Sequence, residues 1–125
     1  MPPQVARRLR KIGNYAEAIK RFKEIADQPE FATKAAVESG EAWELLKQYP
    51  KAIKSYQQAI EVANDNSERD KARKTYAMYR TALLTMVALK DNAAAEQMFS
   101  ELMEFSPGYK DTAARLDKLR KMSDK

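Results

Sequence analysis

Residues 47–56, KQYPKAIKSY, repeat residues 13–22, GNYAEAIKRF, in the order and spacing of their distinctive side chains. The pairs that stand 34 residues apart are Tyr15 and Tyr49, Ala18 and Ala52, and Phe22 and Tyr56. Residues 90–99, KDNAAAEQMF, form a weaker third copy, which is followed by Pro107. Self-similarity at a period of roughly 20–50 residues indicates stacked structural repeats.

Each copy places a small residue four positions before an aromatic one, which puts both on one face of a helix. The three pairs are Ala18 and Phe22, Ala52 and Tyr56, and Ala95 and Phe99. The alanine lets a neighbouring helix approach closely, and the aromatic ring fills the space between helix pairs. One pair cannot bury both of its faces, so we expect the units to stack and to need about three copies for stability.

The composition favours helices, because Ala, Lys, Glu, Leu and Arg are abundant while the chain has only three Gly and five Pro. The chain has no Cys and no His, which excludes thiolate nucleophiles, histidine acid–base catalysis and the usual zinc ligand sets. No apolar run approaches the ~20 residues of a membrane span, and residues 1–4, MPPQ, lead into no signal-peptide core. We therefore expect a cytoplasmic protein that is not an enzyme and needs no cofactor.

The repeated pattern resembles the tetratricopeptide repeat (TPR) family, whose period is also 34 residues. In the second unit the resemblance extends back to Gly40 at the small-residue position and Trp43 at the next aromatic position. It covers nearly the whole chain. The resemblance implies an all-α fold, a right-handed superhelical solenoid of about three antiparallel helix pairs, closed by a C-terminal capping helix.

We interpret residues 1–125 as one domain, and we leave open that it is part of a longer repeat array. The three units span about 3–30, 31–66 and 67–107, and the capping helix spans 109–122. The helices are expected at 3–12, 15–27, 31–47, 50–64, 67–89, 92–105 and 109–122.

The third unit departs from the period. Ala52 and Ala95 are 43 residues apart, and the nine extra residues fall around 64–74. Nine residues make about two and a half helical turns. We expect them to lengthen both flanking helices and to form a protruding, charged tip. Within the same unit, Leu83 stands at the small-residue position and Asn92 at the turn aromatic.

The resemblance also implies a concave groove lined by the first helix of each unit. The residues at its groove positions are Arg7, Arg10, Lys11, Lys34, Glu38, Glu41, Glu44, Tyr76, Arg80, Leu84 and Val87. Such a mixed surface suits a peptide or helix of a partner protein that carries both charged and apolar residues. The predicted function is a non-catalytic protein–protein interaction module, an adaptor or scaffold.

Some members of the family clamp the C-terminal carboxylates of heat-shock chaperones with basic and amide side chains. The matching positions here are Pro3, Arg7, Glu38, Ala77 and Thr81. Because Glu38 would repel a carboxylate, we predict no binding of chaperone tails in this mode.

Two other functions stay open. The net charge of +5 is concentrated at the two ends of the chain, with +5 over residues 1–24 and +3 over residues 110–125, against −3 between them. Nucleic acid could bind the basic N-terminal segment, residues 7–11, although no nucleic-acid motif accompanies it. Self-association into a homo-oligomer is the other alternative.

Overall fold

The computed structural model describes residues 15–123, and all of its regular structure is helical within this range. The helices are α2 (Tyr15–Ile25), α3 (Pro29–Leu45), α4 (Tyr49–Val62), α5 (Glu68–Val87), α6 (Asn92–Phe105) and α7 (Thr112–Ser123). The all-α prediction is therefore confirmed. The expected helix over 3–12 lies outside the described residues.

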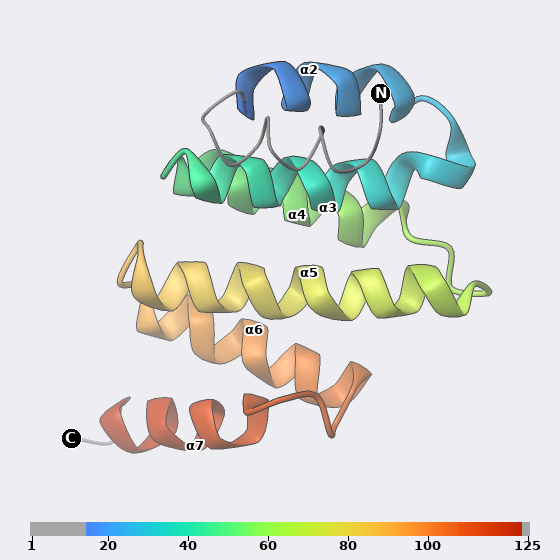
Figure 1. Ribbon diagram of the computed structural model, residues 1–125. Coiled ribbons are helices and arrows are strands. Elements are labelled where there is room, and N and C mark those ends of the chain that lie inside the picture. The colour runs from blue at the N-terminus through green and yellow to red at the C-terminus, as the bar shows by residue number, and fades with distance from the viewer. Residues whose placement is uncertain (1–14, 124–125) are drawn as a thin grey trace.

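Each helix packs against the next one along the chain, and α3 also packs against α5. Figure 1 shows α3, α5 and α7 running in the same direction, with α4 and α6 running back between them. The C-terminal ends of α3, α5 and α7 consequently lie at the same edge of the molecule. None of the helices within residues 15–123 is long and apolar enough to cross a membrane.

Local chemistry explains where the helices begin. Pro29 and Pro50 occupy the first turns of α3 and α4, where the missing N–H costs no hydrogen bond. The helix α3 starts two residues before the expected range 31–47. Ser67 caps α5 by accepting a hydrogen bond from the Asp70 N–H at 3.2 Å, and Asp91 caps α6 through the Ala94 N–H at 3.1 Å.

The helices α3 and α5 end in the same way. Lys47 and Lys90, which are 43 residues apart, follow them in the left-handed region, with φ of 60° and 56°. Gly13 holds the matching position of the first repeat in the sequence. A left-handed residue commonly terminates a helix, so the equivalent turn is built here on lysine.

The repeated small and aromatic residues form the core of the second and third units. Ala52, Tyr56, Ala95 and Phe99 are all fully buried. The predicted packing role of these four residues is therefore confirmed. In the first unit Ala18 and Phe22 are half-buried.

The extra residues lengthen both flanking helices, as expected. The helices α4 and α5 have 14 and 20 residues, three more each than α2 and α3 with 11 and 17, and the other extra residues lie in the connections. Asp70 near the start of α5 is buried, and it accepts hydrogen bonds from the Thr33 hydroxyl at 3.1 Å and the Asn64 N–H at 2.8 Å. The bond from Thr33 holds the first turn of α5 against α3, and the bond from Asn64 ties it to the preceding connection. The first turn of α5 is therefore packed against α3 and does not protrude freely, unlike the expected tip.

The helices α3 and α4 approach each other closely at Gly40. A Cβ atom at this position would lie 2.6 Å from Cε1 of Tyr56, whose ring is fully buried. We expect Gly40→Ala to destabilise the fold by about 1–3 kcal/mol through overpacking, although alanine itself favours helix by about 1 kcal/mol. Urea denaturation followed by circular dichroism measures this change.

The same substitution made together with Tyr56→Leu is the control. With the ring removed, Gly40→Ala should be neutral or stabilising relative to the Tyr56→Leu protein. If alanine is harmless in the wild-type background as well, the close approach described here is wrong.

Candidate functional site

Two hollows follow one another along α5 on the side where it meets α3. One has a volume of about 540 Å³ and is lined by Glu44, Tyr49, Arg80, Leu83, Leu84, Val87, Ala88 and Arg115. The other has a volume of about 420 Å³ and is lined by Val37, Glu41, Ala72, Arg73 and Tyr76. We call the surface that contains both hollows the α3–α5 groove.

Six of the predicted groove residues line these hollows, namely Glu41, Glu44, Tyr76, Arg80, Leu84 and Val87. Lys34 and Glu38 also lie on α3 but line neither hollow, and they form an ion pair at 4.0 Å in which Glu38 is half-buried. The predicted positions Arg7, Arg10 and Lys11 lie outside the described residues.

The two central tyrosines of α5 lie on different faces of the helix. Tyr76 faces the groove, whereas Tyr79 is buried against Phe99. Ala77 and Thr81, which we had matched to two chaperone-clamp positions, are buried as well. Neither of them could contact a bound tail.

Glu44 and Arg80 are bonded to each other, which changes the role expected of them. Arg80 donates two hydrogen bonds to the Glu44 carboxylate, one of them from Nε at 3.1 Å. The Tyr56 hydroxyl donates to the same carboxylate at 2.5 Å. Hydrogen bonding to Glu44 raises the pKa of the Arg80 guanidinium, and burial raises the pKa of the Tyr56 hydroxyl. The two charges therefore join α3, α4 and α5 and contribute little net charge to the groove.

The segment that leads into α7 lies beside Tyr76 of the groove. The Lys110 ammonium lies over the rings of Tyr76, Tyr79 and Tyr109, at 5.8, 5.2 and 5.5 Å from their centroids. These distances are within the range of cation–π attraction. Sequence reasoning did not include Lys110, because its tyrosine neighbours come from two separate segments.

Asp111 anchors this segment to α5. It accepts a hydrogen bond from the Tyr79 hydroxyl at 2.5 Å and another from Arg115 Nε at 2.9 Å. The bond from Tyr79 contributes most to lowering the pKa of Asp111. The spacing of Asp111 and Arg115 on one helical face was the only sequence signal for this contact.

The groove carries charges of both signs. Glu41 on α3 lines the second hollow and Arg115 on α7 lines the first, while Lys110 lies over the ring of Tyr76, which lines the second. The helix α5 supplies apolar surface, including Val87, whose side chain is 62% exposed. Residues 15–123 contain no group of three or more His, Cys, Asp and Glu residues that could hold a metal ion.

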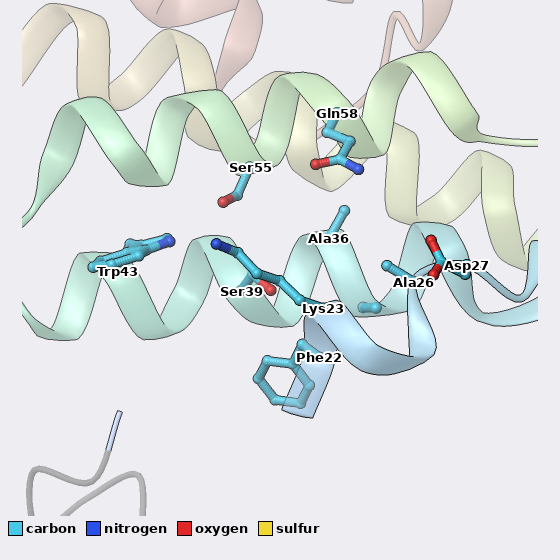
Figure 2. A pocket seen from close by; sticks show the side chains of 10 residues that line it. Phe22, Lys23, Ala26, Asp27, Ala36, Ser39, Trp43, Ser55 and Gln58 are labelled. Carbon is cyan, nitrogen blue, oxygen red and sulfur yellow. The ribbon is translucent and has the colours of Figure 1, made fainter. Parts of the chain in front are cut away.

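A third cavity, of about 280 Å³, lies between α2, α3 and α4. It is lined by Phe22, Lys23, Ala26, Asp27, Ala35, Ala36, Ser39, Trp43, Ser55 and Gln58. Figure 2 shows the Lys23 side chain extending along α3 toward Trp43, while Asp27 lies at the opposite side, near Ala26. The residues that α3 contributes here differ from those it contributes to the α3–α5 groove.

The half-buried ion pair of Glu44 should stabilise the fold more than an exposed ion pair does. Glu44→Ala leaves the Tyr56 hydroxyl and the Arg80 guanidinium without their acceptor in a half-buried position. We expect a loss of about 2–4 kcal/mol in the free energy of unfolding. The matched control is Asp117→Ala, since Asp117 pairs with Lys121 at 3.1 Å with both side chains largely exposed.

The control should lose less than about 0.5 kcal/mol. Chemical denaturation of both variants checks the prediction, and equal losses would show that the Glu44 network does not stabilise the junction.

A scan against protein-family models and searches of curated proteins and of solved structures gave no match to this chain.

Proposed function

We propose that this chain is a non-catalytic adaptor of the tetratricopeptide repeat type, which binds a segment of a partner protein in the α3–α5 groove. One observation carries the proposal: six residues chosen from the repeat pattern line two hollows that follow one another along α5. The 34-residue repeat and the antiparallel helix pairs support the superhelical solenoid on which such grooves are built.

The chemistry of the groove specifies the partner segment. Val87 and Leu84 offer an apolar surface on α5 for one or two aliphatic side chains of the partner. Basic residues of the partner would face Glu41, and acidic ones would face Lys110 and Arg115. An amphipathic segment with charges of both signs meets all three requirements.

Self-association is the second candidate, and a specific observation favours it. Four large apolar side chains are exposed at or just beyond the C-terminal ends of α3, α5 and α7, and these ends share one edge of the molecule. They are Leu45, Val87, Leu89 and Met122, each at least 48% exposed. Apolar side chains gathered on one surface suit contact with another protein, including a second copy.

Selection from a random peptide library tests the adaptor proposal. We expect selected peptides to combine aliphatic residues with charges of both signs. The double substitution Glu41→Lys and Val87→Glu should weaken their binding at least about tenfold, which corresponds to about 1.4 kcal/mol. Fluorescence anisotropy with labelled peptides measures the affinity.

The matched control is Glu61→Lys with Val62→Glu, which makes the same chemical changes on exposed residues of α4. It should bind like the wild type. Equal binding by the folded groove variant would exclude the α3–α5 groove. Light scattering of the free protein distinguishes a homo-oligomer from a monomeric adaptor. Binding that disappears with nuclease treatment or with moderate salt would favour nucleic acid as the partner.

A further inference from the structure

Exposed aliphatic side chains stand at three turns along one edge of the molecule, where α3, α5 and α7 end (Figure 1). Leu45 is the last residue of α3, Leu89 follows the end of α5, and Met122 lies in the last turn of α7. These residues are 57%, 48% and 50% exposed. Apolar side chains that gather on one surface indicate contact with something that removes them from water.

The same three turns carry an excess of positive charge. Residues 45–51, 87–92 and 118–123 contain one acidic residue, Asp91, whose carboxylate caps α6. Against it stand six basic residues, namely Lys47, Lys51, Lys90, Lys118, Arg120 and Lys121. Arg120 and Lys121 form ion pairs with acidic residues of α6 and α7. The exposed side chains of Lys47, Lys90 and Lys118 form no ion pair within residues 15–123, so an anionic partner can reach all three.

Two of these lysines hold backbone positions that suit glycine better. Lys47 and Lys90 have φ angles of 60° and 56°, in the left-handed region. This conformation is strained for an L-residue with a side chain, whereas glycine adopts it freely. Lysine therefore makes each turn less stable than glycine would, while it places an exposed ammonium group at the tip of the turn. The fold alone does not account for these two charges, which points to a role in binding.

The combination of lysines and aliphatic side chains distinguishes between partners. A second copy of this chain would bring the same lysines against these, and like charges oppose such a contact. A nucleic acid would contact the lysines through its phosphates but would leave the aliphatic side chains without an apolar partner. A bilayer with anionic lipids accepts both, because its headgroups attract lysine and the acyl boundary beneath them accepts aliphatic side chains.

We propose that this edge docks the protein on the surface of a membrane that contains anionic lipids. Leu45, Leu89 and Met122 enter the headgroup region, and Lys47, Lys90 and Lys118 contact lipid phosphates and carboxylates. The contact is peripheral, and no helix within residues 15–123 needs to cross the bilayer. It adds a place of action to the proposed adaptor function and does not depend on that function.

Flotation of the full chain with lipid vesicles tests the proposal. We expect the protein to float with vesicles made of equal amounts of phosphatidylcholine and phosphatidylserine. Binding to vesicles of phosphatidylcholine alone should be at least about tenfold weaker, because their surface lacks the negative potential that attracts lysine. High salt should weaken binding to the anionic vesicles, since it screens the same attraction.

The double substitution Lys47→Gly and Lys90→Gly removes two charges of the edge and also relieves the backbone strain. The free energy of unfolding should therefore not fall, while binding to the anionic vesicles should weaken about tenfold. Lys47→Arg with Lys90→Arg keeps both charges and should bind like the wild type. The control Lys23→Gln with Arg69→Gln removes two exposed charges at the opposite edge, where α2 ends and α5 begins, and it should also bind like the wild type.

Leu45→Ser with Leu89→Ser removes aliphatic side chains from the same edge and should also weaken vesicle binding. Equal flotation with both kinds of vesicle, flotation with neither, or wild-type binding by Lys47→Gly with Lys90→Gly overturns the proposal. A dimer in light scattering that Leu45→Ser with Leu89→Ser dissociates assigns the edge to a second copy, and it overturns the proposal too. No peptide is present in these measurements, so their failure leaves the proposed adaptor function standing.

Discussion

The packing of α3, α4 and α5 against one another depends on the side chain of Tyr56. Its ring lies against the backbone of Gly40, and its hydroxyl donates to the Glu44 carboxylate that also binds Arg80. The edge of the ring meets Tyr76 with 6.1 Å between centroids. One residue of α4 therefore sets the distance between α3 and α5. The α3–α5 groove follows from that spacing, because both of its hollows lie between these two helices.

The corresponding positions of the third unit pack together without polar side chains. At the 43-residue offset, Gly40 corresponds to Leu83, Glu44 to Val87 and Tyr56 to Phe99. A phenylalanine has no hydroxyl to bond, and its partner carboxylate is accordingly replaced by valine. The apolar substitutions leave Val87 exposed at the edge of the groove, where Arg80 and Arg115 flank it. The departure of the third unit from the repeat pattern thus creates the apolar part of the candidate site.

Much of the fold could be predicted from the sequence because helical periodicity is local. The core positions Ala52, Tyr56, Ala95 and Phe99 followed from the repeat, and the structure buries all four. Helical periodicity also predicted which face of α3 points away from the core. Contacts between distant segments did not follow, because a pattern along one helix does not identify the side chain opposite.

Three of these distant contacts shape the structure. Arg80 bonds Glu44 across 36 residues, Asp70 bonds Thr33 across 37, and Lys110 lies over Tyr76. The cavity between α2, α3 and α4 was missed for a similar reason. It arises from small residues on three helices, and no single segment shows that they coincide.

The helices α3, α4 and α5 meet at Tyr56. Nuclear Overhauser spectroscopy of the isotope-labelled protein tests this packing. We expect cross-peaks from the Tyr56 ring protons both to the Gly40 Hα protons and to the Tyr76 ring. Cross-peaks to neither residue, in a spectrum that shows folded helices, would contradict the packing on which the groove and its proposed function rest.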